Sequence, residues 1–360
     1  MMREITEDEL NVNEDELNVT ETDSPECFEH YRFTVDKGQA LLRIDKWLMN
    51  HIEGATRNKI QNAAHAGMIL VNETPIKPNY RVKPNDAIII MLPDPPQEVE
   101  ITPQDIPLDV VYEDDDLIVV NKTPFMVVHP GFGNYTGTLL NALLFHFQQQ
   151  KSDAIPFLVH RIDKGTSGLL VVAKTETAQM GLAKQFYDHT TERKYEALVW
   201  GDFTENEGTI TGHIGRGVKD RKVMEVFPDG SQGKFAVTHF RVLRRYGYVT
   251  LVECVLETGR THQIRAHFRY MRHPLFNDVT YGGDQILKGT TFSKYKQFIH
   301  NCFTLCQRQA LHARTLGFIH PVTHEKLSFS SPLPADMQAV IDKWEIYTGN
   351  PQFQEDNDLL

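Results

Sequence analysis

Hydrophobic residues recur at helical spacing in two short segments near the start of the chain, and strand patterns follow them. In LLRIDKWLMNHI, residues 41–52, large apolar side chains return every three or four positions, as on one face of a helix. A second such segment opens at Thr56, a residue type that caps helices, and stops at Gly67. ILVNETPIK then has the pattern of a hairpin and DAIIIML that of a strand, with a turn at Asn85 between them. We predict a module of two helices and a small sheet over residues 35–92.

A larger pattern of interleaved strands and helices extends over residues 108–345. The apolar runs are LDVVYED, DLIVVNK, MVVHPG, GLLVVAKT, KYEALVWG and YVTLVECVLETG. Helical spacing appears in TLLNALLFHF and in residues 176–187, which Thr175 would cap. Within KYEALVWG, Tyr195 alternates with polar positions and would point to one face of a strand. This order predicts an α+β fold with a mixed, largely antiparallel sheet.

The segments outside these two modules differ from them in composition. LPDPPQEVEITPQDIP, which ends at residue 107, has five prolines in sixteen residues and predicts a semi-rigid linker over 93–107. Residues 1–30 hold 11 acids and 1 base, a net charge of −10, and are predicted to be a disordered acidic tail. Residues 346–360 are predicted to be a C-terminal tail.

The distribution of charge changes the meaning of the net charge of −11. Residues 31–360 carry 37 acids and 36 bases, or −1, and residues 31–92 carry 9 bases and 5 acids, or +4. The bases of this module are spread over its predicted polar faces: Arg43, Lys46, Arg57, Lys59, Lys77, Arg81 and Lys83. Such a face suits a polyanion, but a solvated surface looks the same, so composition alone leaves both possibilities open.

Membrane, disulfide, metal and cofactor sites are not indicated. The apolar runs are too short to span a bilayer, and the acidic N-terminus lacks the profile of a signal peptide. Four scattered cysteines suggest no disulfide framework. Cys302 and Cys306 lie near His300 and His312, but without a second cysteine pair they do not indicate zinc. We therefore expect a cytoplasmic monomer without membrane contact, metal or cofactor.

A single acid, Asp163, precedes a Gly-Thr-Ser-Gly turn in VHRIDKGTSGLLVVAKT. Aspartate in such a place commonly forms the turn through its own side chain. Alternatively, the two glycines would allow the backbone to approach a ligand, and Thr166 and Ser167 would donate hydrogen bonds to phosphate. The local pattern does not decide between these two possibilities.

Four segments in the same order resemble the RluA/RluD-type pseudouridine synthases. They are VHRIDKGTSGLLVVAKT, RKYEALVWG, ETGRTHQIRAHF and RQALHARTLGFIHPVT. LIVVNKTPFMVVHPG resembles the opening strands of that family, although Thr123-Pro124-Phe125 stands where Pro-Ala-Gly is usual. Residues 35–92 resemble the S-four-type RNA-binding module of the alpha-L class, and the whole resemblance spans roughly residues 35–340.

The resemblance implies a chemistry that needs only one carboxylate. The family detaches uracil from its ribose at N1, turns it and rejoins it through C5, with no water or redox step, whereas a glycosidase needs a carboxylate pair. Asp163 would be the nucleophile or essential base, attacking C1′ or C6 or removing a ribose proton. Arg265 would pair with it and favour its ionised form. Tyr195 would stack on the flipped uracil and is a candidate acceptor for the C5 proton.

The resemblance also implies which residues contact the RNA. Arg161 would fill the gap left by the flipped nucleotide. On the RNA-binding module, Arg57 and Lys59 would hold the phosphate backbone. Further residues expected near the substrate or the RNA are His160, Thr166, Ser167, His262 and Ile264, and the basic hairpin over 216–234 is expected to touch phosphate.

The implied partner is structured RNA. The RNA-binding module ahead of the catalytic one favours the branch that modifies large-subunit ribosomal RNA, and transfer RNA is the nearest alternative. A non-catalytic ribosome assembly factor with the same fold is a third possibility, but it would be expected to lack the acid or the arginine, and Asp163 and Arg265 are both present.

Overall fold

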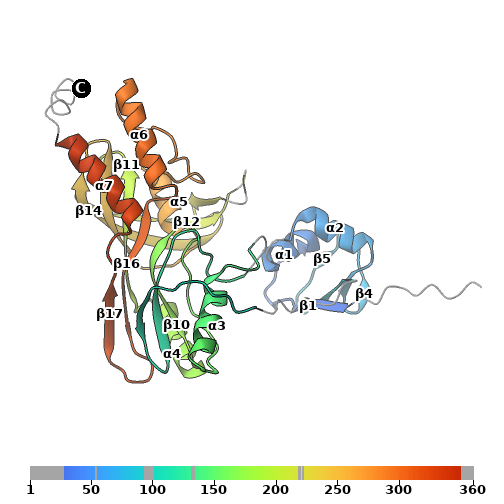
Figure 1. Ribbon diagram of the computed structural model, residues 1–360. Coiled ribbons are helices and arrows are strands. Elements are labelled where there is room, and N and C mark those ends of the chain that lie inside the picture. The colour runs from blue at the N-terminus through green and yellow to red at the C-terminus, as the bar shows by residue number, and fades with distance from the viewer. Residues whose placement is uncertain are drawn as a thin grey trace, which may run out of the picture. The chain divides into compact units, whose positions relative to one another are not determined.

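The computed structural model describes residues 28–52, 55–92, 101–130, 134–217, 220 and 223–349 (Figure 1). They divide into two compact units, within residues 1–100 and within residues 101–360. Most of the predicted tails and of the linker lie outside the described residues. Regular structure extends a few residues into both predicted tails: the first strand begins at Phe28, within 1–30, and the last helix ends at Thr348, within 346–360.

The first unit packs two helices on a small antiparallel sheet. The sheet has the order β1-β6-β3-β4, a separate strand pair is β2-β5, and the bounds are β1 Phe28–Thr34, β2 Leu42–Arg43, α1 Ile44–His51, α2 Arg57–His65, β3 Ile69–Val71, β4 Thr74–Pro75, β5 Arg81–Val82 and β6 Ala87–Leu92. As predicted, the Thr56 hydroxyl caps α2 by accepting from the backbone N–H of Lys59 at 3.3 Å. The β3–β4 hairpin turns tightly because Asn72 and Glu73 adopt φ values of 49° and 66°.

The second unit is built on an eleven-stranded sheet with the path β13-β12-β14-β15-β11-β16-β10-β8-β7, to which β17 and β9 attach beside β16 and β10. Its strands are β7 Val110–Glu113, β8 Leu117–Lys122, β9 Phe157–Leu158, β10 Ser167–Ala173, β11 Glu192–Trp200, β12 Glu207–Arg216, β13 Met224–Phe227, β14 Lys234–Arg245, β15 Val249–Leu256, β16 Leu311–Ile319 and β17 Lys326–Ser330. Its helices are α3 Leu139–Gln149, α4 Glu176–Tyr187, α5 Gln263–Tyr270, α6 Ser293–Leu305 and α7 Ala335–Thr348. Among these strand pairs only β10 and β16 run parallel, so the predicted α+β fold with a mixed, largely antiparallel sheet is confirmed.

Helices cover both faces of this sheet, and alternate residues of each strand serve different faces. In β11, Tyr195 and Ala197 pack in the cluster that contains α3 and α5, whereas Leu198 and Trp200 pack with α6 and α7. In β10, Leu169 instead packs against α4. Figure 1 shows α6 and α7 against each other, apart from α3 and α4. Among the residues described, no helix combines the length and the apolar composition needed to cross a bilayer.

The apolar run MVVHPG does not continue the opening strands. The buried ammonium of Lys122 donates to the carbonyls of Thr123 at 2.8 Å and Met126 at 2.9 Å, and the chain curls around it. Burial lowers the pKa of Lys122 to about 7. Phe125, which replaces the usual glycine, has φ 67°, a left-handed conformation that favours glycine. The departure from the family pattern therefore places an aromatic residue on strained backbone.

His312 predicts how stability depends on pH. It is buried in β16 between the hydroxyls of Ser167 and Ser331, at 3.0 and 2.9 Å, and burial lowers its pKa to about 4. The unfolded chain takes up this proton near pH 6.5, so the folded state loses stability as the pH falls from there towards 4. We expect His312 alone to cost about 2 kcal/mol of unfolding free energy between pH 7 and pH 5.

Urea unfolding at the two pH values checks this expectation. His312→Gln should be less stable at pH 7 but should show a smaller pH-dependent loss than the wild type. His300→Gln, at an exposed position on α6, should keep the full loss. An unchanged pH dependence in His312→Gln would contradict the assignment.

Candidate functional site

The loop between β9 and β10 places Asp163 on a cavity of about 730 Å³. A turn forms this loop, with the N–H of Thr166 donating to the backbone carbonyl of Asp163 at 3.0 Å. The Asp163 side chain is 21% exposed. The cavity walls come from this loop, from β11 and from the N-terminal half of α5 with the residues before it. Together with residues of α4 and Leu311 of β16, these segments, which are distant in sequence, enclose Asp163.

Arg265 of α5 reaches Asp163 from the inner side of the cavity. Its Nη1 donates to Asp163 Oδ2 at 3.0 Å, as the resemblance implied. Its Nε and Nη2 donate to the two carboxylate oxygens of Asp278 at 2.7 and 2.9 Å. Arg265 is only 5% exposed, so it is not the surface residue that its place in an early helical turn would otherwise suggest.

Asp278 is a part of the site that sequence reasoning missed. It is 1% exposed, and its Oδ1 also accepts from the backbone N–H groups of Thr280 at 3.1 Å and Tyr281 at 3.3 Å. The Tyr281 ring lies under the Arg265 guanidinium, 4.9 Å from centroid to carbon. A guanidinium has five N–H donors, so its burial required a second acceptor, but nothing in the sequence indicated which acid supplies it.

Burial and ion pairing act in opposite directions on these groups. Burial lowers the pKa of Arg265, but the hydrogen bonds and charges of Asp278 and Asp163 outweigh it and raise that pKa above its ordinary value. Burial lowers the pKa of His262, with the charge of Asp163 opposing. Arg265 is thus a permanent cation beside Asp163, and His262 is biased to its neutral form.

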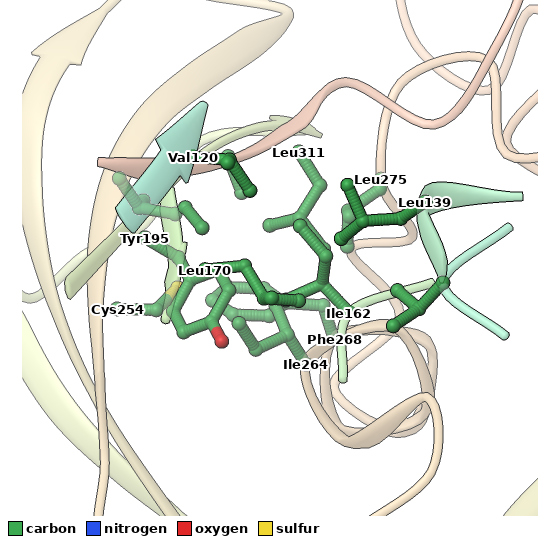
Figure 2. Packing of buried hydrophobic residues seen from close by; sticks show 14 of the residues in the cluster. Val120, Leu139, Ile162, Leu170, Tyr195, Cys254, Ile264, Phe268, Leu275 and Leu311 are labelled. Carbon is green, nitrogen blue, oxygen red and sulfur yellow. The ribbon is translucent and has the colours of Figure 1, made fainter. Parts of the chain in front are cut away.

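Tyr195 and Ile264 form an apolar part of the cavity wall. Figure 2 shows both within the buried cluster, together with Leu170 and Phe268. Tyr195 is 9% exposed and Ile264 is 4% exposed. Burial raises the pKa of Tyr195, with the charge of Arg193 opposing, so its phenol is protonated at neutral pH.

His160 and Arg161 have different surroundings although they are adjacent. The Nε2 of His160 accepts from the N–H of Val171 at 3.0 Å, its ring stacks on Phe186 at 4.3 Å, and burial lowers its pKa to about 3. It is a neutral structural residue that also lines the cavity. Arg161 is exposed at the edge of the cavity. In the described part of the chain its guanidinium makes no hydrogen bond.

The Gly-Thr-Ser-Gly turn serves packing more than ligand contact, which corrects one of the predicted functions. Thr166 is 1% exposed and accepts from Gln309 at 3.3 Å, although it reaches the cavity wall. Ser167 is 2% exposed and is held by His312 and by Arg308, so it does not face a phosphate. Gly168 has φ 116°, and a Cβ there would collide with the backbone of Ala313 where β10 meets β16.

His262 stands at the N-cap position of α5. Its φ is 54°, and its Nδ1 lies at hydrogen-bond distance, 3.0 Å, from the Tyr281 hydroxyl, which also accepts from the N–H of Met224. Its Nε2 is 3.9 Å from Asp163 Oδ2. The imidazole therefore connects Asp163 with the tyrosine beneath Arg265.

In the first unit, Asp45 organises the basic face of the two helices. It is fully buried and accepts from Arg43 at 3.1 and 2.8 Å, from Arg57 at 3.1 Å and from Gln61 at 3.3 Å. The guanidinium of Arg57 is still 53% exposed, and Lys59 is exposed on the same helix. Arg43 and Arg57 are thus fixed in direction while remaining accessible.

One cluster in the described residues has the composition of a metal site. The ligand atoms of Asp114, Asp116 and His320 lie within 4.8 Å of one another. The Nδ1 of His320 accepts from the N–H groups of Val322 and Thr323, so its proton is on Nε2, which donates to Asp114 at 3.0 Å. Hydrogen bonding therefore accounts for this cluster without a metal ion. The thiols of Cys302 and Cys306, the other residues considered for zinc, are buried, and burial raises the pKa of each to about 12.

The division of Arg265 between two acids predicts different costs for removing each of them. Asp278→Asn leaves a buried guanidinium short of its main counter-charge and should lower the unfolding free energy by about 3 to 5 kcal/mol. Asp163→Asn removes the more exposed partner and should cost about 1 kcal/mol or less. Urea unfolding of both variants at pH 7 tests the contrast. Equal losses would show that Asp278 is not the structural partner.

Comparison with known proteins matches both units. Residues 116–270 fit the family model described as RNA pseudouridylate synthase, and residues 42–88 fit that of the S4 domain. The chain is 48% identical over 315 residues to an RNA pseudouridine synthase of Chlorobaculum parvum, covering 86% of this chain and 96% of that protein. It is 40% identical over 307 residues to the ribosomal large subunit pseudouridine synthase D of Zymomonas mobilis, covering 82% of this chain and 92% of that one.

A solved structure supports the same fold. The human RNA pseudouridylate synthase domain containing 4 superimposes with a TM-score of 0.51 at 22% identity, covering 66% of this chain and 92% of that one. Fold, family models and relatives agree with the resemblance that the four motifs carried. The chain belongs to the RNA pseudouridine synthase family and is an isomerase that converts uridine in RNA to pseudouridine, with an S4 domain ahead of its catalytic unit.

Proposed function

We propose that this enzyme modifies specific uridines of large-subunit ribosomal RNA and that Asp163 is its catalytic carboxylate. The contact of Asp163 with the buried Arg265 on an open cavity carries the proposal. The choice of RNA rests on relatives named ribosomal large subunit pseudouridine synthase D, among them those of Zymomonas mobilis and Vibrio cholerae.

The proposed reaction takes place on a nucleotide flipped out of the RNA into the cavity. Asp163 attacks C1′ of its sugar or C6 of its base, or removes a ribose proton. Each route needs an ionised carboxylate, which the neighbouring Arg265 favours. The bond between N1 and C1′ breaks, uracil leaves the ribose as a delocalised anion and turns within the cavity, and C5 forms a new bond to C1′. C5 then loses its proton and N1 gains one, so the reaction is an isomerisation. Because uracil never departs and no water is activated, a second carboxylate is unnecessary.

Tyr195 and Ile264 would bind the base by apolar contact and stacking. The raised pKa of Tyr195 makes its phenolate scarce at neutral pH, which favours stacking over acceptance of the C5 proton. Arg161 would fill the space that the nucleotide leaves, since its guanidinium is exposed beside the cavity. His160 would act through packing, because its acceptor nitrogen is already occupied.

The S4 domain would hold structured RNA through Arg57 and Lys59, with Arg43 beside them. Asp45 orients both arginines without hiding them from the solvent. Contacts of this kind bind phosphates and give affinity without reading sequence. The cytoplasmic location and the monomeric state predicted from the sequence stay predictions.

Pseudouridine mapping in a deletion strain tests both the substrate and the catalytic residue. Sites in large-subunit ribosomal RNA should disappear, return with the wild-type gene and stay absent with Asp163→Asn. The purified Asp163→Asn protein should still bind the RNA, because the basic face of the S4 domain is unchanged.

The alternatives give different patterns. Loss of sites only in transfer RNA would assign the enzyme to that substrate. Restoration of the modification by Asp163→Asn would remove Asp163 from the mechanism. If a strain that lacks the gene assembled ribosomes poorly while its pseudouridines were all retained, an assembly factor would be the better description.

RNA binding should weaken with salt, because phosphate contacts release counterions. For the contact at Lys59, Lys59→Gln should reduce the slope of log affinity against log salt by about one and weaken binding. Lys184→Gln, an exposed lysine on α4 paired with Asp188, serves as the matched control and should leave the slope unchanged. Filter binding between low and moderate salt measures both slopes, and identical slopes for Lys59→Gln and the wild type would exclude a phosphate contact there.

A further inference from the structure

Arg193 of β11 is a buried cation that the proposed reaction does not use. It lies two residues before Tyr195, so alternation along the strand turns both side chains to the same face. Arg193 is 9% exposed, and its Nε is fully covered without a hydrogen-bond acceptor. Within the described residues, its guanidinium makes no hydrogen bond and no ion pair.

Other buried arginines of this unit are fully paired. Arg265 has Asp278 and Asp163, and Arg308 has Asp336 at 2.7 and 3.0 Å. Arg193 has instead the ring of Phe186, 5.5 Å from its central carbon. A ring face offsets little of the cost of burying a charge. Paired burial is thus the rule in this unit, and Arg193 departs from it.

Arg193 places this unpaired charge on the wall of two neighbouring cavities. Arg193 lines the cavity that contains Asp163 and also a neighbouring cavity of about 540 Å³. Thr191, two residues before Arg193, lines the second cavity, and its buried hydroxyl has no hydrogen-bond partner in the described part of the chain. Unsatisfied donors therefore gather where the two cavities share a wall.

The cationic side chains around the first cavity outnumber its acids, so a bound ligand would have to supply a negative charge. Among the described residues that line this cavity, Asp163 is the only acid, and it accepts a hydrogen bond from Arg265. Arg161 and Arg260 also line it without a carboxylate partner, but both reach solvent, which screens their charges. Arg193 is only 9% exposed, so solvent screens its charge less. Its charge is felt locally, since it adds to burial in lowering the pKa of His160.

We infer that Arg193 binds a backbone phosphate of the RNA, at the linkage between the flipped uridine and a neighbouring nucleotide. The inference rests on the proposed function. Phosphodiesters are the anions that an RNA substrate carries, and a guanidinium binds two phosphate oxygens at once. The phosphate would supply the counter-charge that the folded protein leaves out, and so fix the sugar relative to Asp163.

Neutral phosphate linkages test this contact directly. Short RNAs around a mapped uridine are prepared with a methylphosphonate at the linkage on its 5′ or its 3′ side. Arg193→Met should lower kcat/KM about 10- to 100-fold on normal RNA. One methylphosphonate should lower the wild-type value similarly but cause no further loss in Arg193→Met, and Arg193→Lys should recover part of the activity.

The control is Arg241→Met, which removes an exposed arginine of β14 that lines neither cavity. Any loss of kcat/KM caused by Arg241→Met should be independent of the methylphosphonate, so the two fold-losses should multiply when both changes are combined. If the effects of Arg193→Met and of the methylphosphonate also multiply at both linkages, the inference is overturned.

Thermal unfolding tests the same contact without any RNA, so it decides even if the proposed function fails. In sulfate-free buffer, Arg193→Met should melt no lower than the wild type, because it removes an unpaired buried charge. Added sulfate should raise the melting temperature of the wild type more than that of the variant. A lower melting temperature with an equal sulfate response would assign Arg193 to packing on Phe186 and contradict phosphate binding.

Discussion

The guanidinium of Arg265 holds the cavity together because its donors are divided between two acids. Asp278 takes two of them in the interior and fixes the plane of the group, and the remaining direct contact goes to Asp163 at the solvent side. A buried arginine with Asp163 alone would be poorly compensated. The ion pair between Arg265 and Asp278 is therefore needed for the contact between Arg265 and Asp163.

The sheet explains how such a pair forms between residues so distant in sequence. Asp163 precedes β10, Tyr195 lies in β11, and Arg265 begins the helix that follows β15. Because β16 lies between β10 and β11, the side chains near the ends of these strands converge on one side of the sheet. Alternation along β11 then gives one face to Arg193 and Tyr195 and the other to the packing of α6 and α7.

Local patterns in the sequence were enough to predict most of the fold, including α4 from Glu176 to Tyr187 and the Thr56 cap. They failed at MVVHPG, where a buried lysine bends an apolar run that strand propensity favours. For the site, Asp163 and Arg265 came from a resemblance in motif order. Asp278, Asp45 and Arg193 were missed since burial of a charge depends on tertiary packing, which leaves no periodic signal. Ser167 was misassigned because a hydroxyl beside a glycine looks alike whether it faces phosphate or the interior.

The central place of β16 also bears on when the enzyme becomes active. This strand spans residues 311–319, late in the chain, yet it separates β10 from β11 in the finished sheet. Until these residues have been synthesised, β10 and β11 lack the strand that pairs with both of them, and non-local pairing of this kind is slow to form. A chain truncated before residue 311 therefore lacks the strand that lies between β10 and β11.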